Sequence, residues 1–291
     1  MNIREAIKNT YGEGVEIVSR SAVGGGEISR AYVLELSNGA RLFLKMNRAD
    51  KADLFRAEEE GLSAMRETKS VSVPRVIARG TDEAGTFLLM EQIEAGRACK
   101  ASSERLGREL ALMHMADSLR FVPGAKYGFV SDNYIGEIAQ INTAKEKWAD
   151  FFAECRLRPQ IELAAHYFSK EDIKKFDTLL DKLDEYLPEP ERPSLLHGDL
   201  WSGNYLIDTN GKPWLIDPAA YVGHAETDLA MTELFGGFDE HFYGAYKEAV
   251  GIDKGYAERR DLYNLYNLLN HLNHFGSSYL GAVMNTLKKY T

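Results

Sequence analysis

The chain has 291 residues, a hydrophobic fraction of 44% and a formal net charge of −9. This composition is that of a globular protein with one large domain or two modest ones, and it excludes a disordered chain. The acidic balance argues against nucleic acid as a partner, because an acidic surface repels its phosphates, but it does not exclude ATP.

The two cysteines, Cys99 and Cys155, cannot make a disulfide framework, and no CxxC pattern indicates a metal site. They are typical of reduced thiols in a cytosolic protein. The charged start of the chain lacks the apolar stretch of a signal peptide, and no apolar run reaches the roughly 20 residues of a membrane span. We therefore expect no membrane partner and a cytoplasmic location.

The first third of the chain predicts a small, mostly antiparallel sheet with one inserted helix. A short helix over 3–11 is followed by apolar and β-branched runs, and Asn38-Gly39 between two of them is a strong hairpin signal. Residues rich in Ala, Glu, Leu and Met then predict a helix over 52–67. The predicted strands are 15–18, 31–36, 41–46 and 87–91.

From residue 102 onward the pattern changes to helices, interrupted by one strand-turn-strand island over 205–217. The predicted helices are 102–118, 144–166, 170–186, 226–236, 238–250 and 256–275. We therefore predict an α+β fold with two lobes. Residues 1–95 would form a β-rich nucleotide-binding lobe with a hinge at its end, and residues 96–291 a larger helical lobe for catalysis and substrate.

The strongest chemical signal is the segment HGDLWSGN, residues 197–204, followed by Asp217. Phosphoryl transfer needs a carboxylate to position the attacking hydroxyl and oxygen ligands to hold Mg²⁺ on the phosphates. Asp199 followed five residues later by Asn204 matches the protein-kinase catalytic loop, and Asp217 lies where kinases have a second metal ligand, although Pro218 follows it instead of Phe-Gly. We predict Asp199 as the catalytic residue and Asn204 and Asp217 as Mg²⁺ ligands, rather than an ordinary turn.

Lys45 ends a predicted strand, as the phosphate-binding lysine of kinases does. A strand lysine is usually a solvated side chain, but this one lies after a glycine-rich turn and before a helix that bears three consecutive glutamates. A kinase needs one such glutamate to pair with the lysine. We predict Glu58 as the partner, with Glu59 as the chief alternative, and we place Lys45 and Glu58 in an ATP site.

Two further groups complete the predicted ATP site. The turn residues Gly24, Gly25, Gly26 and Ser29 can bring backbone N–H groups close to phosphate, although such a triplet is more often a flexible turn and is neither GxGxxG nor a Walker A motif. The end of the last predicted strand and the residues after it, just before the hinge over 94–96, add Met90, Glu91 and Ile93.

Four more residues have open roles. Asp228 begins a predicted helix, either as an anchor for backbone N–H groups of the catalytic loop or as an acid that the helix dipole stabilises. His271 and His274 are three apart on a helix, but no third metal ligand stands out, so we favour a substrate-lining or structural role. Trp201 is either core or an aromatic face for a sugar or its linker.

With these residues in place, the chain resembles the fructosamine kinase (ketosamine-3-kinase) family over nearly its whole length. Beyond HGDLWSGN, the family's segments are matched at 127–129, 132–136, 140–142, 148–152, 156–160, 217–219, 223–224, 228–231, 235–238 and 269–271. The resemblance implies a protein-kinase-like fold, related to aminoglycoside and choline kinases. It also implies ATP-dependent phosphorylation of the 3-hydroxyl of a ketoamine, a sugar joined to an amine by glycation, after which the unstable product releases the amine.

The resemblance also shapes the expected substrate site. A ketoamine, free or protein-bound, carries a secondary ammonium, and we expect Glu226 to face it beside the metal-binding segment, with Trp201 against the sugar. Val222 and Ala225 depart from the family pattern and leave the preferred sugar open, as the sequence leaves the oligomeric state. The rival hypotheses are another small-molecule kinase, acting on an aminoglycoside or amino alcohol, and a catalytically inactive nucleotide-binding protein.

Overall fold

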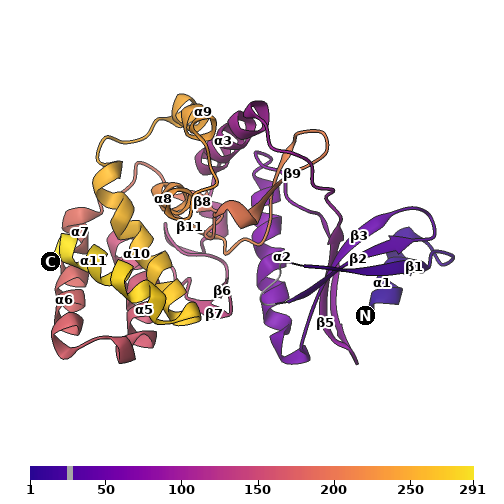
Figure 1. The fold of residues 1–291 in the computed structure, drawn as a ribbon, viewed down its shortest axis with the longest axis horizontal. Helices are drawn as coiled ribbons and strands as arrows, with labels where there is room; N and C mark the ends of the chain where they lie inside the picture. The colour runs from indigo at the N-terminus through magenta and orange to yellow at the C-terminus, as the bar shows by residue number, and fades with distance from the viewer. Residues whose placement is uncertain (25–28) are drawn as a thin grey trace.

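The computed structural model describes residues 1–24 and 29–291. A five-stranded sheet lies at one end of the molecule, the helices of the C-terminal part lie at the other, and helix α2 (Ala52–Glu67) stands between them (Figure 1). Among the helices of these residues, none is long and apolar enough to cross a membrane.

The sheet is antiparallel throughout, with the order β1-β2-β3-β5-β4. Gly39 has a φ of +83° and turns the chain between the second and third strands, as the Asn-Gly signal predicted. The fourth strand was not predicted, because its apolar residues are limited to Val76-Ile77-Ala78, and Arg79 and Gly80 follow them. The bounds are β1 Ile17–Val23, β2 Arg30–Leu36, β3 Arg41–Asn47, β4 Val76–Asp82 and β5 Gly85–Glu91.

The two faces of the sheet bury different partners, because successive side chains of a strand point to opposite faces. Phe87 and Leu89 of β5 pack in one apolar cluster with helix α1 (Ile3–Tyr11), whose first turn is closed by a capping box of Asn2 and Glu5. Leu88 and Met90 join a larger cluster that runs through α2 into the helical part. This core is continuous across residue 95, and the lobe boundary there stays a prediction.

The helical part follows the predicted order with two interruptions. The predicted helix over 144–166 is broken by a π-helical turn, Ala153–Leu157, and the one over 170–186 divides near residue 182. The last helix was not predicted. The bounds are α3 Lys100–Met115, α4 Trp148–Phe152, α5 Arg158–Leu163, α6 Lys170–Asp181, α7 Leu183–Tyr186, α8 Glu226–Leu234, α9 Glu240–Val250, α10 Tyr256–Phe275 and α11 Leu280–Tyr290.

Three short two-stranded ladders lie among these helices and position the candidate site. The predicted hairpin is confirmed, whereas the other two pairs were not predicted, although the strands of all three have three residues each. One of them places the chain before residue 197 beside the chain after residue 220. The strands are β6 Asn133–Ile135 with β7 Ile138–Gln140, β8 Ser194–Leu196 with β11 Tyr221–Gly223, and β9 Tyr205–Ile207 with β10 Pro213–Leu215.

Helices α3 and α9 cross at a point where only glycine fits. A Cβ atom at Gly107 of α3 would lie 2.2 Å from the carbonyl oxygen of Phe242 in α9. Gly244, two residues after Phe242 on α9, has nothing within 4 Å of an added Cβ atom. The two glycines therefore differ in the space around them although both lie in helices at the same crossing.

We expect Gly107→Ala to lower the free energy of unfolding by about 1–3 kcal/mol, because the backbone of α9 must move away. The control Gly244→Ala should raise it by about 0.5–1 kcal/mol, since alanine restricts the unfolded chain and nothing in the fold opposes it. Thermal and urea denaturation of the two variants measure both effects. Equal midpoints for the two variants would contradict the close crossing.

Candidate functional site

The start of the catalytic-loop segment, residues 197–204, is hydrogen-bonded to a buried carboxylate. Asp228 of α8 accepts hydrogen bonds from the backbone N–H groups of His197 at 2.8 Å and Gly198 at 2.9 Å. Gly198 has a φ of +81°, and a Cβ atom there would lie 2.0 Å from the carbonyl oxygen of Ala219, so glycine is required. The anchor interpretation of Asp228 is confirmed.

Asp228 is ionised although it is only 1% exposed. Burial would raise its pKa, but the hydrogen bond from His114, at 3.1 Å, and those from the loop outweigh burial and lower it.

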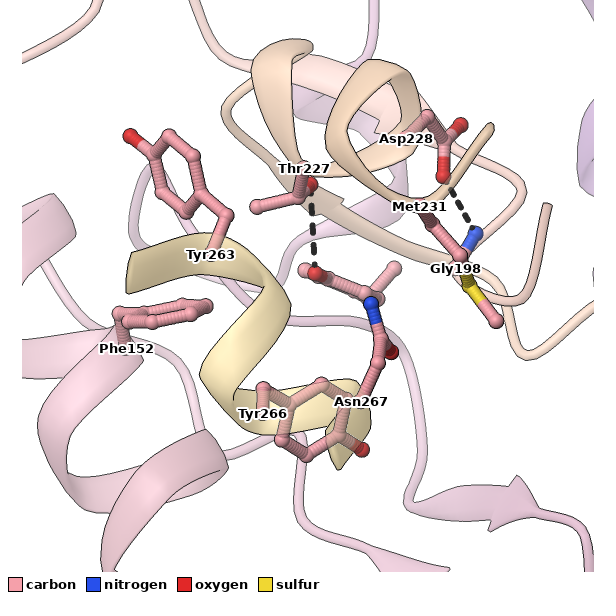
Figure 2. A pocket seen from close by; sticks show the side chains of 9 residues that line it. Phe152, Gly198, Thr227, Asp228, Met231, Tyr263, Tyr266 and Asn267 are labelled. Carbon is pink, nitrogen blue, oxygen red and sulfur yellow. Dashed lines mark hydrogen bonds between the residues drawn. The ribbon is translucent and has the colours of Figure 1, made fainter. Parts of the chain in front are cut away.

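Figure 2 shows Asp228 bonded to Gly198 at the edge of a small cavity lined by Tyr266 and Asn267. None of the predicted nucleotide or metal residues lines this cavity, so it is a packing gap beneath the loop and not the reaction site.

Asp199 and Asn204 contact each other, as the kinase-like spacing predicts. The amide nitrogen of Asn204 donates to the backbone oxygen and to the carboxylate of Asp199, both at 2.8 Å. Burial raises the pKa of Asp199 to about 7, against the opposing effect of the Asn204 bond. A carboxylate with a pKa near neutrality is suited to accept a proton from a hydroxyl. Both of these bonds use the amide nitrogen of Asn204, and metal binding by its amide oxygen stays a prediction.

His197 links this loop to the segment that ends in Asp217. Its Nδ1 accepts a hydrogen bond from the backbone N–H of Asp199 at 3.3 Å, so Nε2 carries the hydrogen and donates to the carbonyl of Ile216 at 2.8 Å. Burial lowers the pKa of His197, which keeps the ring neutral. The sequence motif contained this histidine, but only the structure shows that its ring is hydrogen-bonded to both the segment of Asp199 and the segment that ends in Asp217.

Asp217 has a left-handed backbone conformation that is costly for a residue other than glycine. Its φ is +54°, and such a conformation persists only where the surroundings determine it. On one side Ile216 donates its N–H to the carbonyl of Asn204 at 3.0 Å, and on the other Ala219 donates to the carbonyl of His197 at 2.9 Å. The predicted metal ligand is thus tied to both ends of the catalytic loop.

Lys45 joins the sheet to this segment. Its ammonium donates to Glu58 of α2 at 2.7 Å and to Asp217, which lies 172 positions later in the chain. The predicted pairing with Glu58 is confirmed, whereas the alternative, Glu59, pairs with Arg79 of β4 at 2.8 Å. Contact of Lys45 with phosphate stays a prediction.

The three charges of this cluster adjust one another's ionisation. Burial would lower the pKa of Lys45, but Asp217 and Glu58 outweigh it and raise the pKa. Partial burial would raise the pKa of Asp217, but the Lys45 ammonium outweighs it and holds the pKa below its usual value. Burial raises the pKa of Glu58 to about 7, against the opposing effect of Lys45. Lys45 and Asp217 therefore remain charged at neutral pH.

The oxygen atoms of Asn204 and Asp217 fit Mg²⁺. This ion keeps much of its shell as water or substrate phosphate and needs only one or two protein carboxylates. Within residues 1–24 and 29–291, no group of three or more His, Cys, Asp or Glu side chains could hold a metal by protein ligands alone. Binding of Mg²⁺ by Asn204 and Asp217 stays a prediction.

The glycine-rich turn is only partly described. Gly25 and Gly26 lie outside the described residues. Gly24 is exposed, and the hydroxyl oxygen of Ser29 accepts a hydrogen bond from the side chain of Asn47 at 3.1 Å. The role of all four predicted residues toward phosphate stays a prediction.

Near the hinge, the side chains of the predicted residues are occupied within the protein. Met90 is buried in the core, and the Glu91 carboxylate accepts a hydrogen bond from the backbone N–H of Arg75 at 2.8 Å. The side-chain amide of Gln92 donates to the carbonyl of Ile93 at 2.9 Å. The parts that Met90, Glu91 and Ile93 take in nucleotide binding stay predictions.

Glu226 does not have the environment that the sequence analysis expected. Its two carboxylate oxygens accept hydrogen bonds from Arg259 of α10 at 2.7 and 2.6 Å, and the residue is buried. The expectation that it faces a substrate ammonium is wrong on this geometry, because its charge is already neutralised inside the protein. Glu226 fastens α8 to α10 instead.

The two histidines of α10 have different surroundings. Nε2 of His274 lies 3.2 Å from the carbonyl of Ile135 in β6, so this side chain supports the β6–β7 turn. The ring of His271 lies among Phe235, Phe275 and Tyr279, with centroid distances of 4.6–5.2 Å, and burial lowers its pKa to about 4. We assign His274 a structural role, while substrate contact by His271 stays a prediction.

Trp201 is not core, because its side chain is 40% exposed. The indole covers Gly203, where a Cβ atom would lie 2.3 Å from the ring. An aromatic face beside Asp199 is therefore open to solvent, as the stacking hypothesis requires.

Comparison with known proteins adds independent evidence. The fructosamine kinase family model matches residues 1–291. The chain is 40% identical over 288 residues to a probable ketoamine kinase of Synechocystis sp., covering 99% of this chain and 95% of the relative. It is 39% identical to the chloroplastic protein-ribulosamine 3-kinase of Arabidopsis thaliana, covering 99% of this chain and 87% of the relative.

Solved structures show the same fold. A crystal structure from Thermobifida fusca that carries a fructosamine-3-kinase name has a TM-score of 0.84 at 32% identity, with 99% of each chain covered. An aminoglycoside phosphotransferase in a ternary complex with ADP and hygromycin B has a TM-score of 0.64 at 17% identity, with 99% of each chain covered, which shows the fold alone. The predicted protein-kinase-like α+β fold is confirmed, and the chain belongs to the fructosamine kinase family.

Proposed function

We propose that this protein transfers the γ-phosphoryl group of ATP to the 3-hydroxyl of a ketoamine, either a fructosamine or a ribulosamine. The observation that carries the phosphoryl-transfer part is the cluster of Lys45, Glu58 and Asp217, because three distant segments meet there in the arrangement that kinases use. The ketoamine part rests on the relatives, which are named as ketoamine and ribulosamine kinases over nearly the whole chain.

Each residue of the proposed site has its own role in the reaction. Asp199 orients the acceptor hydroxyl and takes its proton as the new O–P bond forms and ADP leaves. Lys45 holds a phosphate oxygen, and Glu58 keeps the ammonium in place. Asn204 and Asp217 would hold Mg²⁺, which, when bound, neutralises charge on the phosphate oxygens. The solvent-exposed face of Trp201 offers an apolar surface for the sugar carbons.

The two rival hypotheses, another small-molecule kinase and a catalytically inactive nucleotide-binding protein, have less support. Solved aminoglycoside phosphotransferases share the fold only at 17% identity, whereas the ketoamine kinase relatives reach 40%. A catalytically inactive protein would not need Asp199, Asn204, Lys45 and Asp217 together. A cytoplasmic location and the acceptor's form, free or protein-bound, stay predictions.

Replacement of the catalytic carboxylate separates chemistry from binding. We expect Asp199→Asn to lower kcat by about 10²–10⁴-fold, because it cannot take the proton, while binding of ATP is retained. In the wild type, kcat/KM should rise with pH through about 7, since Asp199 must lose its proton to act and its pKa is raised to that value. Steady-state kinetics from pH 5.5 to 8.5 tests both. Near-normal turnover of the variant at pH 7.5 would exclude the assignment.

The two predicted metal ligands should contribute unequally to turnover. We expect Asp217→Ala to abolish Mg²⁺-dependent turnover, because it removes the charged ligand and also a partner of Lys45. Asn204→Ala should do less harm, since it removes one neutral oxygen. Titration of activity with Mg²⁺ measures the difference. Retained activity with an unchanged Mg²⁺ requirement in Asp217→Ala would show that the metal lies elsewhere.

The acceptor should be a ketoamine, with the ribulose adduct used at least as well as the fructose adduct of the same amine. The relative named protein-ribulosamine 3-kinase supports this order. Kinetics on the two adducts, with hygromycin B and choline as rival acceptors and ATP alone as the control, measures the preference. A clearly higher kcat/KM for the fructose adduct would reverse the order, and turnover of neither adduct would reject the ketoamine assignment.

A further inference from the structure

The helix that carries Glu58 is bonded to a distant segment through one arginine. Arg56 of α2 donates from Nη1 to the hydroxyl of Ser131 at 2.9 Å and from Nη2 to the carbonyl of Asp132 at 3.2 Å. The same guanidinium is held on its own helix by Asp53 at 2.5 Å and Glu60 at 2.6 Å. Because its donors are fixed in one rigid fork, the group sets the distance and angle between the helix and the segment.

Two more hydrogen bonds reinforce this contact. The Ser131 hydroxyl donates to Glu60 at 2.6 Å, and the hydroxyl of Tyr134 in β6 donates to Asp53 at 3.1 Å. Both acceptors are the carboxylates that hold Arg56. The contact is therefore a closed network of charge-assisted bonds and not a single ion pair on the surface.

The opposite side of the same segment holds the loop that follows Asp217. The side-chain amide of Asn133 donates to the carbonyl of Ala220 at 2.7 Å, and that of Gln140 in β7 donates to the carbonyl of Ala219 at 3.0 Å. Gln140 also donates to Asn133 at 2.8 Å, and both side chains are buried. These carbonyls lie two and three residues after the metal ligand, so the two amides constrain its backbone.

A second layer of buried polar groups fixes the two amides. Asn142 donates to the side-chain oxygen of Asn133 at 2.9 Å and accepts from Arg156 at 2.8 Å. The hydroxyl of Tyr266 in α10 donates to Gln140 at 2.7 Å. Arg156 is 0% exposed, and its Nη1 and Nη2 are hydrogen-bonded although its Nε has no partner. A buried network with this many bonds favours one arrangement, which makes it rigid.

Helix α2 also contacts the loop directly. A Cβ atom at Gly61 would lie 3.0 Å from Cγ of Pro218 and 3.3 Å from Cβ of Ala220. The helix, the segment and the loop therefore meet pairwise, and each pair is joined by its own contacts. The left-handed conformation of Asp217 has its support in this arrangement.

We propose that residues 131–142, named here the bracket, fix the helix of Glu58 to the loop of Asp217, and that Arg56 and Gln140 are positioning residues for nucleotide and metal. Neither side chain touches the reacting atoms; each acts through the backbone or helix that it holds. The two partners of Lys45 are thereby placed before nucleotide arrives. The proposal rests on the proposed function only in taking Asp217 as the Mg²⁺ ligand.

The competing account is that these residues merely stabilise the fold. The chain offers a matched control, because Arg79 ties the same helix to strand β4 through Glu59 at 2.8 Å instead of to the bracket. Arg79→Ala removes an arginine pair of α2 with comparable exposure and leaves the bracket intact. If only stability matters, the two arginine variants should lose function in proportion to stability.

The direct test is binding of Mg²⁺ with AMP-PNP to the full chain, measured by calorimetry without acceptor. Arg56→Ala, Ser131→Ala and Gln140→Leu should each weaken binding by about tenfold, the effect expected for loss of a hydrogen bond to a charged or buried group. Gln140→Leu should affect binding in the presence of Mg²⁺ more than in EDTA, because it acts on Asp217. Arg79→Ala should bind as the wild type does.

Melting temperatures and kinetics complete the comparison. Bracket variants should show a raised KM for ATP and a lower kcat with an unchanged KM for the acceptor, and Arg56→Lys should be intermediate because it keeps the charge but not the fork. If Gln140→Leu does not fold, Ser131→Ala, which deletes one hydroxyl, decides. Binding equal to that of Arg79→Ala at similar melting temperature would overturn the proposal.

This design separates the two proposals. Failure of the wild type to phosphorylate any ketoamine would reject the proposed function, while the nucleotide-binding measurements would still test the bracket. Unchanged nucleotide binding in the bracket variants would reject the bracket, while the ketoamine assay would stand.

Discussion

The ammonium of Lys45 between the carboxylates of Glu58 and Asp217 is the interaction on which the rest of the site depends. The side chains of Lys45 and Glu58 are only 12% and 13% exposed, and buried charges are costly unless each has a partner in good geometry, whereas Asp217, at 45% exposed, binds the ammonium from the solvent side. They come from strand β3, helix α2 and the loop after β10. Sheet, helix and loop must therefore all be in place, and the continuous core through α2 and β5 supplies that placement.

Two carboxylates of the site have different ionisation because their surroundings differ. Asp199 is half-buried beside the neutral amide of Asn204, and desolvation raises its pKa to about 7. Asp217 contacts an ammonium, and its pKa lies below the usual value. One carboxylate is thus suited to exchange a proton and the other to remain an anion that holds a cation, which is a common division of labour between paired acids.

Whether the partner of a site residue could be predicted depends on how far apart the two residues lie in the sequence. Asp199 and Asn204 are five residues apart, and the contact between them follows from a local motif. The same reasoning predicted Glu58 as the partner of Lys45, with Glu59 as the alternative, and the structure confirms Glu58. Glu226 was misread, because its partner Arg259 lies 33 positions away and no local pattern reveals a buried ion pair of that span. The strands β6 and β7 were missed, since, unlike the equally short β9 and β10, they have no Asn-Gly turn between them.

The sequence by itself determined the fold class, the order of the longer strands and of most helices, and the catalytic loop, because these depend on periodicity, turn residues and close spacing. It also contained Asn133, Gln140 and Arg156, but as segments of a family pattern without a physical role. Only the tertiary structure decided that role, since their partners are backbone carbonyls and side chains up to 126 positions away. Hydrogen bonds of that range depend on how the chain packs, and neighbouring residues do not encode them.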